Sequence, residues 1–250
     1  MSAQGTIRVG IGGWVFPPWR GTFYPPDLKQ ADELSYASRH VTAIEINGTF
    51  YRLQNPKSYR NWHDAAPDDF VFALKGSRYI VNRSELAEAA PAMERFFASG
   101  MTELGAKLGP ILWQLTPNKT FGEADLSAFV EALPKRLGNR PLRHVLEARH
   151  KSFGDPGCAE LLRRHNVALA QVDDAKYPLF EAVTADFVYA RLRRCSEDEP
   201  AGYSPQALDA IAERFRKHAA DGRDCFVYFI NGAKTRAPHA AMALIERLKS

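Results

Sequence analysis

Cysteine is scarce in this sequence, and its three copies are far apart: Cys158, Cys195 and Cys225. They form no C-x-x-C pair, so neither a paired zinc-binding motif nor a dithiol redox motif is indicated. An odd, dispersed set fits reduced thiols. We therefore expect a cytoplasmic protein whose cysteines serve mainly as small buried side chains.

Long apolar runs are also absent, and none approaches the ~18 residues of a membrane-spanning helix. The first residues, MSAQGTIRVGIGG, lack the basic and apolar regions of a signal peptide. We expect no membrane association.

The charge is nearly balanced, with 33 Lys and Arg against 29 Asp and Glu and a net charge of +4. This mild excess does not imply nucleic acid by itself, but it leaves anionic ligands open.

Several catalytic motifs are missing. The sequence has no G-x-S-x-G nucleophile elbow, no H-E-x-x-H zinc motif and no H-x-H pair. Gly10, Gly12 and Gly13 do not have the G-x-G-x-x-G spacing of a dinucleotide-binding loop. We expect no cofactor. A hard divalent ion held by Glu45, Glu147 and Asp173 remains an alternative, because Mg²⁺ needs only a few oxygen ligands.

Short apolar runs rich in β-branched and aromatic residues recur along the 250 residues, at 7–11, 41–46, 70–74, 111–115, 144–149, 167–173, 187–192 and 225–230. Helical patterns lie between most of them, with the clearest at 204–222 and others at 85–105, 125–138 and 238–248. Eight strand–helix repeats of this length predict one α/β domain over 1–250, a (β/α)8 TIM-type barrel. A doubly wound sheet is the alternative fold. We find no linker that would divide the chain.

Polar residues follow the predicted strands, where barrel enzymes place their catalytic groups. Glu45 and Asn47 have the i, i+2 spacing that turns both side chains to one face of a strand, and Glu147 and Arg149 repeat it. Ile44 and Ile46 mark the opposite face of the first pair. If the apolar faces meet the outer helices, the polar faces line the barrel mouth. A buried Glu–Arg pair that only fills the barrel is the structural alternative.

Six segments carry a family resemblance: GIGGWVFPPWRGTFYPPDL, EINGTFYRL, FVFALKGSRYIVN, LGPILWQLTPNKTF, EARHKSF and FVYARL…GYS. In order and spacing, from residue 7 to about 248, the chain resembles domain-of-unknown-function family 72, the YecE-like proteins. The resemblance implies a TIM-type barrel and no defined activity. Two departures stand out, because similar proteins usually have His-Gly where this chain has Arg193-Arg194, and Asn-Asn where it has Ile230-Asn231.

Three residues are candidates for catalysis. Glu45 and Glu147, from different strands, could act as acid and base on a sugar-like substrate. Lys75 could form a Schiff base if burial lowers its pKa, or could instead pair with Glu45 or bind an anion. Substrate-binding candidates are the other polar and aromatic residues at the same end: Trp14, Asn47, Tyr51, Gln114, Arg149, His150, Asp173, Arg191, Tyr203, Tyr228 and Asn231.

The first long loop is rich in aromatic residues, among them Trp14, Phe16, Trp19, Phe23 and Tyr24. Such rings either stack on a ligand or form a small core that fixes the loop. Basic residues crowd the same end of the barrel. Two functions follow: an enzyme, such as a hydrolase or lyase, acting on a small anionic sugar- or nucleotide-like molecule, or a non-catalytic module that binds single-stranded or damaged nucleic acid.

Overall fold

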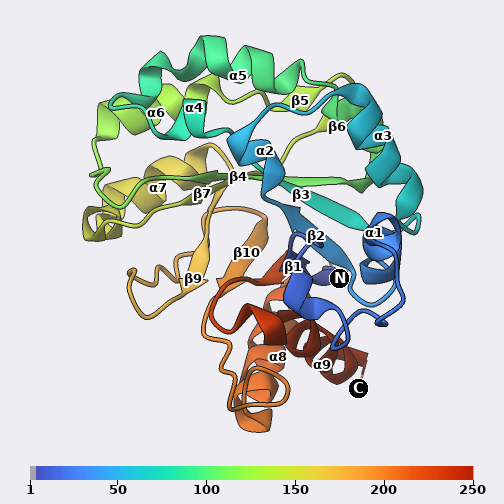
Figure 1. Cartoon of the computed structure of the whole chain (residues 1–250). Helices are drawn as coiled ribbons and strands as arrows, with labels where there is room; N and C mark the ends of the chain where they lie inside the picture. The colour runs from blue at the N-terminus through green and yellow to red at the C-terminus, as the bar shows by residue number, and fades with distance from the viewer. Residues whose placement is uncertain (1–3, 250) are drawn as a thin grey trace.

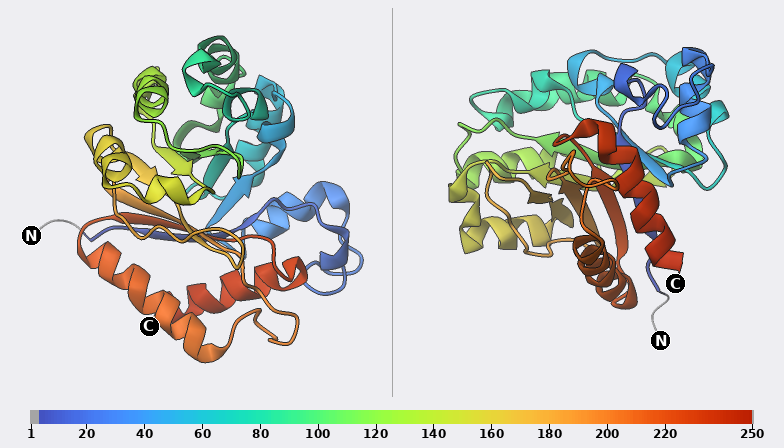
Figure 2. Two further views of the ribbon diagram at one scale, coloured as in Figure 1. Left: turned by 90° about the vertical axis from the view of Figure 1, so that its left-hand side faces the viewer. Right: turned by 60° about the horizontal axis from the view of Figure 1, so that its bottom comes forward.

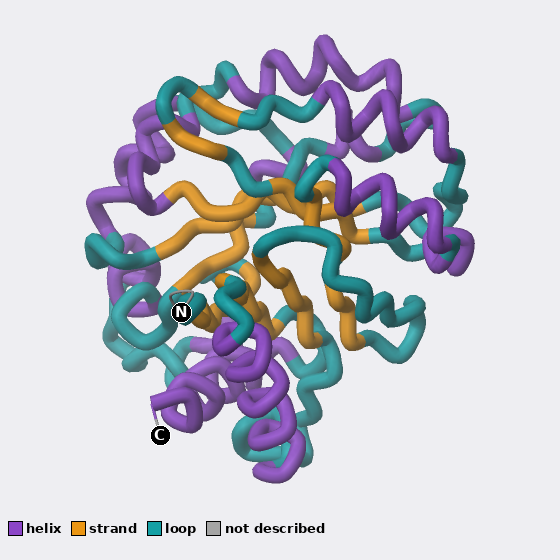
Figure 3. Tube along the Cα trace, turned by 180° about the vertical axis from the view of Figure 1, so that it is seen from behind, coloured by secondary structure: helices purple, strands orange, loops and turns teal. Residues whose placement is uncertain are grey.

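A ring of parallel strands surrounded by helices dominates the computed structural model, which describes residues 4–249 (Figures 1 and 3). Within that range, nine strands share the main sheet in the order β8-β7-β4-β3-β2-β1-β11-β10-β9. They are β1 Ile7–Gly12, β2 Ala43–Ile46, β3 Val71–Lys75, β4 Leu108–Gln114, β7 His144–Glu147, β8 Val167–Leu169, β9 Gln171–Asp173, β10 Phe187–Leu192 and β11 Asp224–Phe229. The predicted TIM-type α/β barrel is confirmed.

The two edges of the sheet are formed by β8 and β9, which follow each other directly in the sequence. β8 pairs with β7 and β9 pairs with β10, and only Ala170 separates β8 from β9. The predicted strand at 167–173 is therefore two short strands, because its halves belong to opposite edges of the sheet. The amide of Ala170 still donates to the carbonyl of Leu146 at 2.9 Å, so the backbone remains paired at the break.

Helices cover the outside of the ring (Figure 2). The α-helices are α1 Glu33–Ala37, α2 Gly48–Tyr51, α3 Pro56–Ala65, α4 Arg78–Val81, α5 Ala90–Phe97, α6 Glu123–Ala132, α7 Pro156–Arg164, α8 Pro205–Ala220 and α9 Ala237–Lys249. Short 3-10 turns are η1 Pro17–Trp19, η2 Gln30–Asp32, η3 Leu86–Ala89, η4 Met101–Lys107, η5 Lys151–Gly154 and η6 Lys234–Arg236. A two-residue hairpin joins β5 Arg136–Leu137 to β6 Arg140–Pro141. Within the described range, no helix is both apolar enough and long enough to span a membrane.

The helix predictions are mostly confirmed. Ser204 caps α8 by accepting from the amide of Ala207 at 3.2 Å, as its position before Pro205 indicates. The helix predicted at 85–105 is divided into η3, α5 and η4, and Pro91 lies in the first turn of α5. The segment 174–186, between β9 and β10, has no helix, so the strand–helix alternation lapses there.

Side chains alternate between the two faces of the strands. Ile44 and Ile46 pack in the outer core against the helices, whereas Ala43 and Glu45 point into the barrel. The inner core contains several alanines among larger rings, including Tyr189 and Tyr228. Small side chains on some strands leave room inside the barrel for Tyr189, Tyr228 and Arg191 from other strands. The inner face is therefore apolar at the bottom and polar at the carboxyl ends of the strands.

Gly76 directly follows β3 and makes room for Trp113. A Cβ at Gly76 would lie 2.2 Å from Cε3 of Trp113, whose side chain is fully buried. We expect Gly76→Ala to lower the free energy of unfolding by about 1–3 kcal/mol through overpacking. Gly122→Ala is the matched control, because nothing lies within 4 Å of a Cβ there. Denaturant unfolding of both variants tests this, and equal stability would contradict it.

Candidate functional site

A cavity of about 680 Å³ opens at the carboxyl ends of the strands. The predicted residues that line it are Trp14, Asn47, Tyr51, Lys75, Gln114, Arg149, Arg191 and Asn231. They come from β1, β2, α2, β3, β4, β7, β10 and β11 or the residues just after them. The carboxyl ends of parallel strands meet at one end of a barrel, and so residues far apart in the sequence share one wall.

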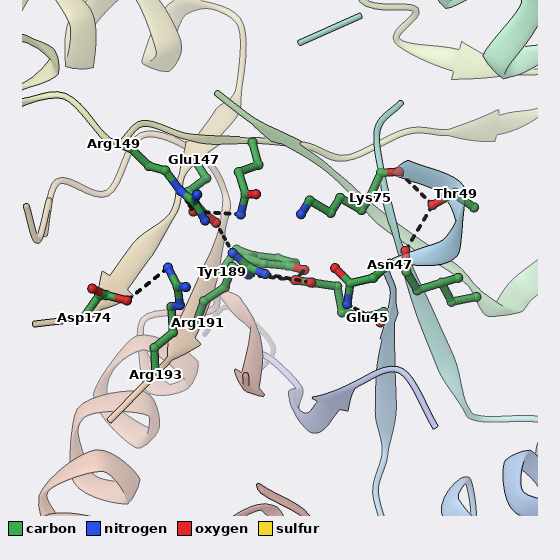
Figure 4. A network of polar contacts seen from close by, with 12 residues as sticks. Glu45, Asn47, Thr49, Lys75, Glu147, Arg149, Asp174, Tyr189, Arg191 and Arg193 are labelled. Atoms are coloured by element: carbon green, nitrogen blue, oxygen red, sulfur yellow. Dashed lines mark hydrogen bonds and ion pairs between the residues drawn. The ribbon is translucent and has the colours of Figure 1, made fainter. Parts of the chain in front are cut away.

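The floor of this cavity is a buried ion cluster centred on Arg191 (Figure 4). Its guanidinium binds Glu45 through two bonds of 3.0 Å and also binds Glu147. The hydroxyl of Tyr189 donates to Glu45 at 2.7 Å. Both glutamates are 0% exposed and Arg191 is 2% exposed. A buried arginine needs such partners, because an unpaired buried charge is costly.

Glu147 is the most heavily bonded carboxylate of the cluster. One oxygen accepts from Gln114 at 2.9 Å and from Arg149 at 2.7 Å, and the other faces Arg191. Burial by itself would raise the pKa of Glu147, but Arg191, Arg149 and Gln114 outweigh it and lower the pKa from 4.5 to about 2. The cluster therefore holds Glu147 as a carboxylate throughout the neutral range.

Neither glutamate lines the cavity wall. The prediction that Glu45 and Glu147 face the substrate as acid and base does not match this placement, because both carboxylates are fully buried and paired with Arg191, which does line the cavity. A general acid or base must come within hydrogen-bond reach of the reacting group. The two residues are better described as the support that holds Arg191 in place.

Lys75 has a different environment. Its side chain is 7% exposed and lines the cavity. Its carbonyl accepts from the hydroxyl of Thr49 at 2.7 Å, and its ammonium lies 4.3 Å from the centre of the Phe50 ring. Among residues 4–249, no hydrogen bond or ion pair is found for this ammonium (Figure 4). The expected pairing of Lys75 with Glu45 is wrong, because Arg191 already occupies that carboxylate.

The environment of Lys75 also changes its acidity. Desolvation and the neighbouring Arg191 and Arg149 lower its pKa, while Glu45 and Glu147 offset part of the effect. The pKa falls from 10.5 to about 8. Lys75 therefore releases its proton much more readily than an ordinary lysine.

Six cationic side chains line the cavity: Arg52, Lys75, Arg149, Arg191, Arg193 and Lys234. No Asp or Glu is found among its lining residues within the described chain. Arg193 forms an ion pair with Asp174 at 3.0 Å, and Arg149 and Arg191 pair with the buried glutamates. Arg52, Lys75 and Lys234 have no carboxylate partner in residues 4–249. The open space is thus bordered by a net positive charge.

Aromatic rings form another part of the wall. Trp14 and Trp62 meet edge to face at 5.6 Å between ring centres, and Tyr51 is 60% exposed beside them. The hydroxyl of Tyr24 donates to the carbonyl of Trp14 at 2.6 Å and so fixes the start of the first loop. Trp19, in the same loop, is fully buried. The loop therefore has its own small core, as one alternative predicts, and Trp14 also lines the cavity. Stacking of Trp14 on a ligand stays a prediction.

Four predicted substrate-binding residues do not line the cavity: His150, Asp173, Tyr203 and Tyr228. His150 caps η5 through Ser152, and Asp173 forms an ion pair with Arg194 at 2.6 Å. The hydroxyl of Tyr203 accepts from the backbone amide of Arg194, and Tyr228 is buried inside the barrel. These placements outside the cavity follow from local partners and burial that the sequence pattern does not reveal.

The alternative metal site is not assembled. In residues 4–249, no three His, Cys, Asp or Glu side chains are grouped as a metal site would require. Asp173 pairs with Arg194, while Glu45 and Glu147 bind Arg191. Each of the three proposed ligands is thus already paired with an arginine, Arg191 for the two glutamates and Arg194 for Asp173.

Three cavity residues lie outside the sequence prediction, namely Arg52, Gln54 and Trp62, whereas Arg193 and Lys234 belong to the basic residues expected at this end of the barrel. Trp62 lies on α3, which is not among the helices predicted from the sequence. Arg193 and Lys234 follow predicted strands closely, and that position was a usable signal. Tyr177, from the loop after β9, lies 4.5 Å from the guanidinium of Arg149 and 5.6 Å from that of Arg193.

Comparisons with known proteins give one family and one fold. The family model described as "Protein of unknown function DUF72" matches residues 8–250. The UPF0759 protein YecE of Escherichia coli is 27% identical over 150 residues, which cover 59% of this chain and 50% of YecE. The UPF0759 protein YunF of Bacillus subtilis is 23% identical over 155 residues, covering 60% of this chain and 53% of YunF. The chain spans about half the length of these curated relatives.

A crystal structure of a DUF72 family protein from Thermotoga maritima has a similar fold. It superposes with a TM-score of 0.80 at 22% identity, covering 98% of this chain and 100% of that one. At this identity the likeness shows the barrel fold and nothing about the ligand.

Proposed function

The chain belongs to the DUF72 family, and on that premise we propose that its barrel mouth is the active site of an enzyme acting on a phosphate-bearing, sugar- or nucleotide-like molecule. The observation that carries this proposal is the cavity lining, which has six cations and, within the described residues, no carboxylate. Arginine and lysine side chains are the usual protein partners of phosphate oxygens.

The charges divide into fixed and available ones. Arg149 and Arg191 are held by the buried glutamates, so they are rigid but partly neutralised. Arg52, Lys75 and Lys234 have no carboxylate partner in residues 4–249, so their charge is available to a ligand. A preorganised floor with unpaired cations around it favours a small anion over a neutral sugar.

The aromatic wall supports an organic ligand attached to the anionic group. Trp14 and Trp62 offer an apolar surface next to Asn47 and Gln54, whose amides can hydrogen-bond a sugar or base. Lys75 is the cavity residue best suited to chemistry, since it combines burial, a pKa of about 8 and an unpaired ammonium. It replaces the two glutamates as the preferred catalytic group.

Phosphate binding gives a direct test. We expect the protein to bind inorganic phosphate and ribose 5-phosphate, but not ribose, in titration calorimetry. Lys234→Met should weaken binding of both anions roughly tenfold, since a hydrogen bond to a charged group contributes about 1.5 kcal/mol or more. Lys57→Met, an exposed change on α3 outside the cavity, is the control. Equal affinity for ribose and ribose 5-phosphate would contradict the proposal.

One feature favours the alternative of a nucleic-acid-binding module. Tyr51 and Tyr79 are each 60% exposed at this end of the barrel, and the guanidinium of Arg78 lies 5.2 Å from the Tyr79 ring. Exposed rings beside cations can stack on unpaired bases. Binding of a single-stranded oligonucleotide that weakens steeply with salt, without turnover of any small phosphate ester, would favour this alternative.

A further inference from the structure

We propose that Lys75 is a nucleophile that forms an imine with an aldehyde or ketone bearing a phosphate or carboxylate group. This inference rests on the proposed function of the site and narrows its substrate class. It starts from the position of one amine: Lys75 ends β3, lines the cavity and is 7% exposed.

A second buried lysine shows what a structural role looks like in this protein. Lys107 is 3% exposed, and its ammonium donates to the carbonyls of His63 at 2.6 Å and Ala66 at 2.7 Å. It also lies 3.8 Å from Asp68. Lys75 is almost equally buried, yet within residues 4–249 its ammonium has no hydrogen bond or ion pair and lies over the Phe50 ring, 4.3 Å from its centre. Its amine is therefore unpaired and directed into an open cavity, where a ligand can reach it.

The base of the Lys75 side chain is held firmly. Thr49 donates from its hydroxyl to the Lys75 carbonyl at 2.7 Å and to the Ile46 carbonyl at 3.0 Å, so it ties the ends of β2 and β3 together. Gly76, the residue after Lys75, lies so close to the Trp113 ring that a Cβ there would be 2.2 Å from it. A fixed backbone restricts the positions that the Lys75 amine can occupy, and this favours its attack on a bound carbonyl group.

The neighbouring charges favour the neutral, nucleophilic form of the amine. Burial and the proximity of Arg191 and Arg149 lower the pKa of Lys75 to about 8. About a tenth of the molecules then carry a neutral Lys75 at pH 7. Only the neutral amine has the lone pair needed to attack a carbonyl carbon.

The reaction balances without an oxidant or a reductant. The nitrogen lone pair forms a bond to the carbonyl carbon as the carbonyl π electrons move to oxygen, and one proton passes from the nitrogen to that oxygen, which gives a neutral carbinolamine. The hydroxyl then takes a proton from solvent and leaves as water while the nitrogen lone pair forms the carbon–nitrogen double bond. Neutral lysine, the carbonyl compound and one proton thus yield a protonated imine and water. The anionic group of the substrate, held by the cavity cations, offsets the positive charge of this imine.

Reductive trapping tests the proposal on the whole protein. Glycolaldehyde phosphate is the probe, with sodium cyanoborohydride as the trapping reductant, and intact mass followed by peptide mapping is the readout. We expect one adduct per chain, located at Lys75, suppressed by inorganic phosphate and much weaker with unphosphorylated glycolaldehyde. The trapping rate should rise with pH around a midpoint near 8, because the neutral amine is the reactant.

Two variants sharpen the result. Lys75→Arg keeps the positive charge but cannot form an imine, so the single adduct should disappear. Lys151→Arg changes an exposed lysine outside the cavity and should leave the adduct unchanged. Labelling spread over exposed lysines without enrichment at Lys75 would overturn the proposal. If calorimetry shows phosphate binding but no adduct forms, the imine is wrong and the anionic site stands. If neither is seen, both fail.

Discussion

Glu147→Gln is expected to lower the free energy of unfolding by about 3–5 kcal/mol, the range found when one partner of a buried ion pair is removed. The carboxylate is 0% exposed and accepts bonds from Gln114, Arg149 and Arg191. A glutamine can offer only one accepting oxygen, so its amide nitrogen would face a donor. It would also leave Arg191 with one buried counter-charge instead of two.

The pH dependence of stability supplies an independent measurement of the same interaction. The folded pKa of Glu147 is about 2, below its ordinary value of 4.5. A lowered carboxyl pKa stabilises the fold at pH values above 4.5, and this contribution is lost as the pH falls from 4.5 toward 2. Wild type should therefore lose stability more steeply than Glu147→Gln across that interval, and the two should converge at its acid end.

The matched control for this prediction is Glu94→Gln, which removes the same charge from an exposed position on α5. We expect it to change the free energy of unfolding by less than about 0.5 kcal/mol, as is usual for surface substitutions. Urea unfolding of both variants at neutral pH makes the comparison. If Glu147→Gln stayed as stable as wild type but lost ligand turnover, the carboxylate would belong to the chemistry and not to the support.

The sequence supports the fold prediction because barrel strands carry a two-residue alternation that side-chain polarity makes visible. In β2, the order Ala43-Ile44-Glu45-Ile46 predicts which side chains meet the helices, and the structure confirms it. The break at Ala170 was not predictable in this way, since the sequence from 167 to 173 has no turn residue that would divide it into β8 and β9. Only the pairing partners on either side reveal that the run serves two edges.

The site was predictable in its location but not in its internal pairing. A strand end tells where a side chain lies, and so Lys75, Gln114 and Arg191 were correctly expected at the mouth. Which carboxylate pairs with which cation depends on distances across the barrel, such as the 3.0 Å between Arg191 and Glu45, which are 146 residues apart. In that geometry the two glutamates hold Arg191 and do not line the cavity, and Lys75 has no ion-pair partner in the described chain.

Lys75→Met is expected to abolish covalent trapping and at the same time to make the protein more stable. Keeping a charged ammonium in a desolvated position beside Arg191 costs folding energy, which the lowered pKa reports. The fall in the pKa of Lys75 from 10.5 to about 8 corresponds to roughly 3 kcal/mol of folding free energy lost by the charged form. Methionine has a similar length and no charge, so we expect a gain of about 1–3 kcal/mol at neutral pH.

The sign of the pH dependence follows from the same shift. Because the folded pKa of Lys75 lies below the unfolded one, the unfolded chain binds more protons between about pH 8 and 10.5, and wild-type stability gains from Lys75 over that interval. The stability advantage of Lys75→Met over wild type should therefore be largest below pH 8 and vanish near pH 10.5.

Lys107→Met is the contrasting variant, because it removes an ammonium bonded to two carbonyls and should destabilise the protein. A loss of stability in Lys75→Met equal to that of Lys107→Met would show that Lys75 also serves the scaffold, whereas a gain in stability with loss of trapping is the pattern of a residue held at a cost for its chemistry.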